Sequence, residues 1–183
     1  MNDKLCSGND MAFTDEFITN MIMILLEEAS DDFWKILKYG STDATTNPLH
    51  TISLDDKLAM IKQENVDGNG RLLTRIRRLK FNDDITTEAH TEIRIFDGSW
   101  IVPTLVDYDI IYGIEIISAN SIICLKDGRT TLNILRNEIY KVFNGRTVDK
   151  NIGRLSNVGV GGSITVFNKM YQGYQFGLRG SSA

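Results

Sequence analysis

The stretch Thr130–Gly145, TTLNILRNEIYKVFNG, decides the fold because it is the clearest helix in the chain and strand-like segments flank it on both sides. Its apolar residues recur at helical spacing and line one face. They are Leu132, Leu135, Ile139 and Val142. Thr130 or Thr131 is placed to cap the start, and Asn144–Gly145 supplies the left-handed residue at which helices end. The stretch predicts an amphipathic helix that covers one face of a sheet.

Strand-like segments stand before and after this helix. Residues 91–96 alternate, with Ile93 and Ile95 on one side and Glu92 and Arg94 on the other. Further strands are predicted at 71–81, 110–118, 121–126, 164–167 and 171–178. Turns are predicted at Asp97–Gly98 and Ala119–Asn120. The order of helices, strands, one helix and strands predicts an α+β fold, a small antiparallel sheet with one amphipathic helix packed on it.

The N-terminal third is predicted to be helical after a mobile segment at 1–13. Thr14 is placed to cap a first helix, a second helix ends at Gly40, and Ser53 caps a third. No Pro-rich linker or composition shift divides the chain after residue 13. We expect one domain over 14–183, with a helical part at 14–63 and a sheet part at 71–178.

The first helix carries more apolar surface than one stripe. Such a helix packs on its own domain and has surface left for a neighbour. We therefore expect it to contribute to an interface with another protein chain. The interface candidates on it are Phe17, Met21, Ile24 and Leu25. The segments at 40–51 and 146–163 are predicted to be long loops, longer than a compact domain needs, and to act as interface arms.

Composition places the chain among ordinary folded proteins. It has 183 residues, of which 42% are hydrophobic and 24% charged, and its net charge is −4. These values exclude a collagen, a disulfide scaffold and global disorder. The negative net charge also argues against a nucleic-acid binder that depends on the charge of the whole domain. Cys6 and Cys124 are far apart in sequence, so both thiols are expected to be free, with Cys124 a small core residue.

The run at 71–81, RLLTRIRRLKF, concentrates basic residues on one predicted strand. These are Arg71, Arg75, Arg77, Arg78 and Lys80. Alternation sends basic side chains to both faces of the strand, which is awkward inside a sheet. Three interpretations remain open: an edge strand protected by its charge, a strand that meets an acidic neighbour, or a strand that contacts phosphates.

The sequence shows no constellation that predicts catalysis or a resident ion. The adjacent carboxylate pairs stand at helix starts or turns, where they cap or face solvent. The segment at 65–70, NVDGNG, resembles the start of a calcium loop, but Ile76 occupies the place of the bidentate glutamate. His50 and His90 are isolated. We expect no catalytic residues, no metal site and no cofactor.

Several stretches together resemble tailed-bacteriophage neck proteins, the class of head-completion, head–tail connector and tail-terminator proteins. The resemblance covers roughly residues 33–178. It is carried by WKILKYGSTDATTNP at 34–48, TEIRIF at 91–96, LNILRNEIYKVFNG at 132–145, IGRL at 152–155 and YQGYQFGL at 171–178. In terminator-like members a helix packs on a small antiparallel sheet, and loops and arms bridge subunits.

The resemblance implies a structural virion protein, not an enzyme. Such proteins form homo-oligomeric rings, sixfold or twelvefold, between portal and tail, where they seal the packaged genome. The implied partners are copies of the chain, the neighbouring portal, connector or tail proteins and, in passing, genomic DNA, with no membrane. The implied location is the virion neck, after assembly in the host cytoplasm. The alternative is a small phage nucleic-acid-binding or regulatory protein that uses the basic strand at 71–80.

Overall fold

The computed structural model describes residues 8–46, 51–62, 68, 73–78, 89–101, 109–148, 153–166 and 169–181. The helices are α1 (Gly8–Glu28), α2 (Asp31–Tyr39), α3 (Leu54–Ile61) and α4 (Thr131–Phe143), with a short 3₁₀ turn η1 (Asn120–Ile122). The strands are β1 (Ile76–Arg77), β2 (Thr91–Ile101), β3 (Asp109–Ala119), β4 (Ser156–Val166) and β5 (Tyr171–Ser181). The predicted α+β class is confirmed.

The strands form one sheet in the order β1-β2-β3-β5-β4. β2, β3, β5 and β4 pair antiparallel, as predicted, whereas the two-residue β1 pairs parallel to β2. The sheet is therefore mixed, with a short parallel edge. β1 follows α3 in the chain, and its two residues pair with Ile93 and Arg94 of β2.

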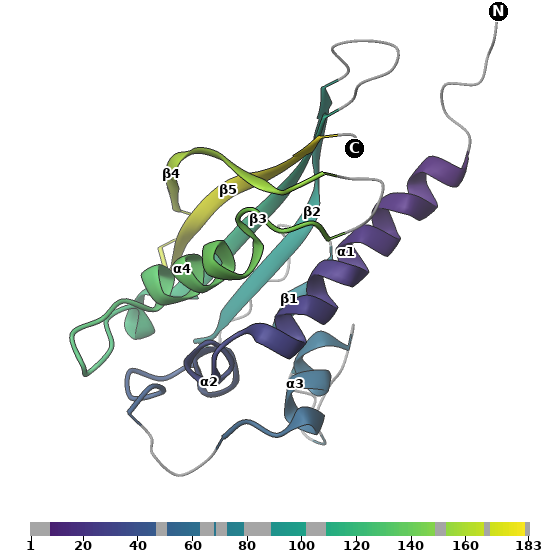
Figure 1. Cartoon of the computed structure of the whole chain (residues 1–183). Helices are drawn as coiled ribbons and strands as arrows, with labels where there is room; N and C mark the ends of the chain where they lie inside the picture. Colours follow the sequence, from purple (N-terminus) through teal and green to yellow (C-terminus); the bar gives the residue numbers. More distant parts are fainter. Residues whose placement is uncertain are drawn as a thin grey trace, which may run out of the picture.

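The helices cover one face of this sheet (Figure 1). The covered face carries Ile93 and Ile95 of β2 together with Ile114 and Ile116 of β3, all fully buried. From the helix side, the ring of Phe17 stacks on Tyr112 at a centroid distance of 4.2 Å. Burying this apolar face removes a large area from water and supplies the main stabilisation of the fold.

The decisive stretch forms α4 as predicted, and its apolar stripe at 132, 135, 139 and 142 is buried. Thr130 stands at the N-cap without a side-chain capping bond, and the Thr131 hydroxyl instead donates to the carbonyl of Ile122. At the other end Gly145 has a φ of 78°, which is the left-handed conformation expected after a helix. Gly40, at φ 50°, ends α2 in the same way.

Several predicted boundaries are wrong. α1 begins at Gly8, before the predicted cap at Thr14, so residues 8–13 of the segment predicted as mobile are helical. The segment 121–126 is not a strand, because β5 occupies the position beside β3. Ile122, Ile123 and Leu125 of that segment are buried in the 3₁₀ turn and the residues after it, whereas Cys124, predicted to be a core residue, is exposed.

Two strands are longer than predicted, because residues that are expected to form turns or loops lie at register shifts inside the strands. β2 runs through Asp97–Gly98 to Ile101, with a register shift between Asp97 and Ser99. β4 begins at Ser156, inside the predicted loop at 146–163, and its register with β5 shifts between Val158 and Ser163. The glycines at 159, 161 and 162 fall within this shift, which is the place where a β-bulge tolerates them. The division into domains stays a prediction, and residues 1–7, including Cys6, lie outside the described residues.

A glycine on the sheet generates a test of the packing. Phe96 of β2 lies opposite Gly113 of β3, and a Cβ on Gly113 would come within 2.6 Å of Phe96 Cζ. Because Phe96 is buried, its ring has little room to move away. We expect Gly113→Ala to lower the free energy of unfolding by about 1–3 kcal/mol, measured by urea denaturation.

Gly68→Ala is the matched control, because nothing lies within 4 Å of its added Cβ, and we expect a change within about 0.5 kcal/mol. Adding Phe96→Leu to Gly113→Ala should recover part of the loss. Strict additivity of the two substitutions would show that the clash with the ring is not the cause.

Candidate assembly interface

Most of the interface predicted on α1 is buried inside the chain itself. Phe17, Met21 and Leu25 are fully buried, and Ile24 is partly buried against the same core. Most of the described apolar surface of α1 is thus used on the sheet and the other helices, although Met23 stays 45% exposed. The interface assignment stays a prediction, and of the predicted side chains only Ile24 keeps part of its surface at the exterior.

Where the structure describes the basic run, its arginines are buried or partly buried. Arg75 is buried, and its backbone bonds Met60 on one side and Ile93 on the other, at 2.8 Å each. Arg77 Nε lies 3.2 Å from Glu92 Oε2. Arg78 is partly buried. Of the three interpretations, the edge strand agrees with the place of β1 at the edge of the sheet, and Arg77 also meets an acidic residue, Glu92, of the same chain. Contact of the basic run with a protein partner or with phosphates stays a prediction. Arg71 and Lys80 lie outside the described residues.

Glu92 is the centre of a buried ionic cluster that the sequence did not predict. Arg94 Nε donates to Glu92 Oε1 at 2.7 Å, and Arg94 Nη1 lies 3.9 Å from Glu115 Oε2. His90 Nε2 lies 3.4 Å from Glu92 Oε2. Glu92, Arg94 and Glu115 are each only 1% exposed. The cluster fixes β1, β2 and β3 to one another through charge as well as through the backbone ladder.

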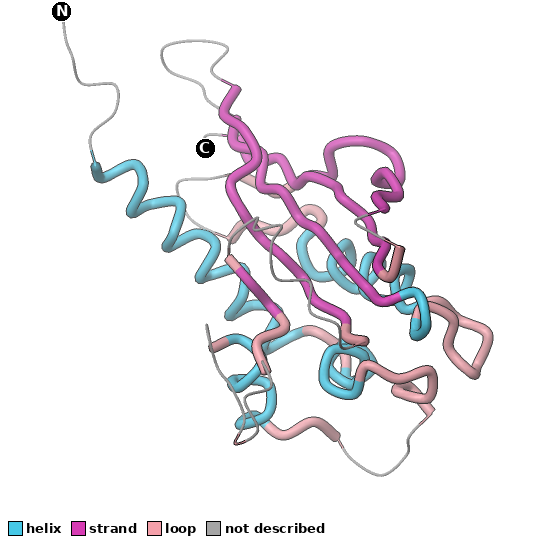
Figure 2. The backbone as a smooth tube through the Cα atoms, turned by 180° about the vertical axis from the view of Figure 1, so that it is seen from behind, coloured by secondary structure: helices cyan, strands magenta, loops and turns pink. Residues whose placement is uncertain are grey.

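This cluster lies on the sheet face opposite the helices, the face turned toward the viewer in Figure 2. Pairing of Arg94 with Glu115 across β2 and β3, and of Arg77 with Arg94 across β1 and β2, brings the charged side chains to one face. Tyr171 at the start of β5 extends the cluster, because its hydroxyl lies 3.1 Å from His90 Nδ1. Four strands therefore contribute to it.

The pKa of the Glu92 carboxyl shows that the cluster favours the charged form. Burial opposes ionisation of Glu92 and is the largest single effect on it. The hydrogen bond to His90 and the charges of Arg94 and Arg77 outweigh burial and hold the pKa below its ordinary value. Glu92 is thus an anion at neutral pH that depends on its cationic neighbours.

One sequence signal, the alternation at 91–96, places Glu92 and Arg94 on one face of the strand but does not show that this face is buried. A charged face on an alternating strand is normally solvated. Only the pairing register of the strands shows that opposite charges meet. It places Glu115 of β3 opposite Arg94 of β2, and it places Arg77 of β1 on the other side of Arg94. Register depends on strands distant in sequence, so no local pattern could reveal the cluster.

The first predicted arm is fixed to the domain wherever it is described. Residues 40–46 lie against the turn at 126–129: Lys126 N donates to the carbonyl of Thr42 at 2.7 Å, and the Thr45 hydroxyl donates to Asp127 Oδ2 at 2.7 Å. Lys126 Nζ also lies 3.1 Å from Asp43 Oδ2. This segment is a tied surface loop, not a free arm, because hydrogen bonds to the turn satisfy its polar groups.

The described residues contain no group of three or more His, Cys, Asp or Glu side chains arranged to hold a metal ion. Nor does any helix in the described part of the chain have the length and apolarity needed to cross a bilayer. Of the NVDGNG segment, only Gly68 lies within the described residues.

Removing the central carboxylate tests the cluster. We expect Glu92→Ala to lower the free energy of unfolding by about 3–5 kcal/mol, because it leaves buried cations uncompensated. Lys141→Ala, which breaks an exposed ion pair with Glu138, is the control and should cost less than about 1 kcal/mol. Glu92→Gln keeps the shape of the side chain and removes its charge. Wild-type stability of that variant in thermal melts would show that the charge is not needed.

The hydrogen bonds that Asp127 accepts predict that the stability of the folded protein depends on pH. Hydrogen bonds to Asp127 from the Arg129 side chain and backbone, and from Thr45, lower the pKa of its carboxyl from 3.8 to about 2. A carboxyl whose pKa is lower in the folded state than in the unfolded state stabilises the fold. This stabilisation is complete when the pH is above the unfolded-state pKa, and it is lost as the pH falls through the folded-state pKa. The contribution should therefore be full above about pH 4 and disappear toward pH 2.

We expect Asp127→Asn to melt below the wild type at pH 5 and to approach it as the pH falls to 2, measured by circular dichroism. A difference in melting temperature that stays constant over this range would contradict the assignment. Glu27→Gln is the control, because Glu27 of α1 is an exposed carboxylate outside this network.

Comparison with known proteins identifies a family. The family model described as YomW matches residues 30–178, which span α2 to β5 and leave α1 outside. No curated protein and no solved structure matches the chain significantly. The match covers most of the chain, so the chain belongs to the YomW family, a phage-associated family, which indicates a phage-derived protein.

Proposed function

We propose that this protein is a structural component of the phage virion that forms an oligomeric ring in the neck, between portal and tail. In this role it joins head to tail and helps to seal the packaged genome, without catalysing a reaction. Its partners are copies of itself and the neighbouring neck proteins.

The observation that carries the proposal is the order and packing of the elements. α4 stands between β3 and β4 in sequence and packs on the sheet, in contact with β3 and β5 (Figure 1). A helix packed on a small, mainly antiparallel sheet is the arrangement that the resemblance to terminator-like ring proteins implies. The phage association of the family is consistent with it.

Elements that reach beyond the core support an assembly role as well. In Figure 1 the first turns of α1 and the paired ends of β2 and β3 extend past the helices at the same end of the molecule. β2 and β3 remain paired out to Ile101 and Asp109. Extended elements of this kind are typical of subunits that contact neighbours, and they take the place of the tied segment at 40–46 as candidate arms.

The nucleic-acid alternative receives no support from the described residues. Phosphate binding needs accessible cations. Arg75 is buried, and Arg77 is paired with a buried carboxylate. These two side chains are placed to stabilise the sheet. We therefore propose the structural role in the virion and not the nucleic-acid-binding role.

Three measurements test the proposed function together. The purified protein should form oligomers of defined size in mass photometry, and mass spectrometry should find it in purified particles of the phage that encodes it. Deleting its gene should give filled heads and separate tails in electron micrographs. A monomer that is absent from particles, with normal virions after deletion, would refute the proposal.

A further inference from the structure

The outer side of α3 carries an apolar stripe that its own domain does not cover. Leu54 is 61% exposed and Leu58 is 43% exposed, and the two stand four residues apart on one side of the helix. Asp55, also exposed, lies between them in sequence. We call Leu54, Asp55 and Leu58 the α3 stripe. Exposed apolar residues grouped in this way mark contact sites more often than solitary ones do.

The opposite side of α3 holds the helix firmly, so the α3 stripe is a defined surface. Met60 is buried, Lys57 Nζ lies 5.4 Å from the centroid of the Trp34 ring, and Lys38 Nζ lies 2.7 Å from Asp56 Oδ2. Ser53 caps the helix by accepting from the backbone N–H of Asp56. These contacts fix the rotation of α3 and leave its leucines facing outward.

A second exposed apolar site lies just before β5. Met170 is 50% exposed, and Lys169 beside it is exposed too. We call this pair the β5 knob. Asn120 holds it in place: its backbone N–H donates to the carbonyl of Met170 at 2.7 Å, and its side-chain amide donates to the carbonyl of Lys169 at 3.0 Å. A pre-formed knob loses little conformational entropy when it binds.

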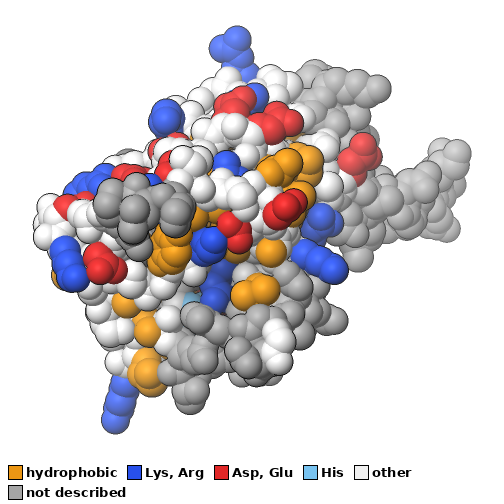
Figure 3. Space-filling model, turned by 90° about the horizontal axis from the view of Figure 1, so that it is seen from below, with side chains coloured by type: hydrophobic (Ala, Val, Ile, Leu, Met, Phe, Trp, Pro, Cys, Tyr) orange, Lys and Arg blue, Asp and Glu red, His pale blue; other side chains and the backbone are white. Residues whose placement is uncertain are grey.

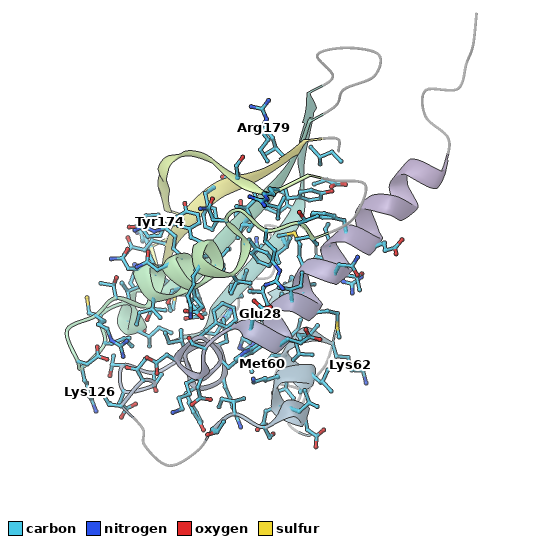
Figure 4. The ribbon with its side chains drawn as sticks, in the orientation of Figure 1. Glu28, Met60, Lys62, Lys126, Tyr174 and Arg179 are labelled. Carbon is cyan, nitrogen blue, oxygen red and sulfur yellow. The ribbon has the colours of Figure 1, made fainter. Side chains whose placement is uncertain are left out.

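The two sites complement each other in chemistry and in position. The α3 stripe is apolar with an acidic residue, and the β5 knob is apolar with a basic residue. The two sites come from different parts of the molecule: in Figure 4, α3 is marked by Met60 and Lys62, and β5 is marked by Tyr174. In Figure 3, seen from the end that holds α2 and α3, hydrophobic side chains emerge between acidic and basic ones.

We propose that the α3 stripe of one copy of this chain binds the β5 knob of the next copy. Met170 packs against Leu54 and Leu58, and Lys169 lies against Asp55. Because the two surfaces differ, the contact is head-to-tail, and repeating it through a closing rotation gives a ring. This inference rests on the proposed function and names the contact that builds its ring.

A second copy is the occupant that the observations favour. A foreign partner would need only one of the two sites, whereas self-assembly accounts for both of them and for their opposite charges. An apolar centre with charged groups around it is also the usual anatomy of a protein interface.

Directed disulfides test the contact. In a chain with Cys6→Ser and Cys124→Ser, Leu58→Cys and Met170→Cys are introduced singly and together. Mixing the two single variants under mild oxidation should give dimers and nothing larger, whereas the chain with both cysteines should give a ladder that ends at the ring size. Asn137→Cys on the exposed side of α4, mixed with Met170→Cys, is the matched control and should not crosslink.

Charge exchange gives a second, independent result. Asp55→Lys or Lys169→Glu alone should weaken association about tenfold or more in sedimentation velocity, and the two changes together should restore it. Melting temperatures will show whether each variant is folded, which is expected because both residues are exposed.

The outcomes separate the two proposals. Wild-type oligomers whose size is unchanged by Leu58→Lys, with no Leu58–Met170 crosslink, would overturn this contact and leave the ring intact. A wild type that is monomeric at every concentration and absent from virions would overturn the proposed function itself. Crosslinking of Met170 to the α4 control as strongly as to α3 would mean random collision and would also overturn the contact.

Discussion

The packing of helices against the isoleucine face of the sheet is the contact on which the rest of the structure depends. Ile93, Ile95, Ile114 and Ile116 form a surface that cannot face water, and α4 together with the second half of α1 removes it from solvent. This burial explains why Phe17, Met21 and Leu25 of α1 are covered within one chain. It also explains why α1, although it lies outside the family match, belongs to the core: without it, Tyr112 would lose the ring of Phe17 that stacks on it.

The other face of the sheet is organised by charge. Glu92 accepts from Arg94 and lies close to Arg77 and His90, and the whole group is withdrawn from water. Buried ions are costly, and they persist only where opposite charges and hydrogen bonds compensate for the lost hydration. The cluster therefore couples the short parallel strand β1 to the antiparallel sheet. It also makes Arg77, which belongs to a basic run that suggests phosphate binding, an internal support.

The assembly that we propose uses the parts of the surface that neither face of the sheet uses. α3 is held by Met60 and by the stacking of Lys57 on Trp34, so its leucines face outward. The β5 knob is held by the hydrogen bonds that Asn120 donates to the carbonyls of Lys169 and Met170. Rigid elements that present apolar residues are suited to binding, because their order is established before the partner arrives. A phage-derived chain with two such different sites has the features needed for a repeating contact.

The sequence by itself determined the elements whose signals are local. The spacing of Leu132, Leu135, Ile139 and Val142 defined α4, the left-handed glycines ended α2 and α4, and the alternation at 91–96 defined β2, because all of these depend on neighbours along the chain. It could not determine which strand lies beside β3, and for that reason the strand predicted at 121–126 is wrong. Nor could it show that Glu92 and Arg94 are buried or that Leu54 and Leu58 are exposed. Those outcomes were decided by the tertiary structure alone, since register and helix rotation are set by contacts between residues far apart in sequence.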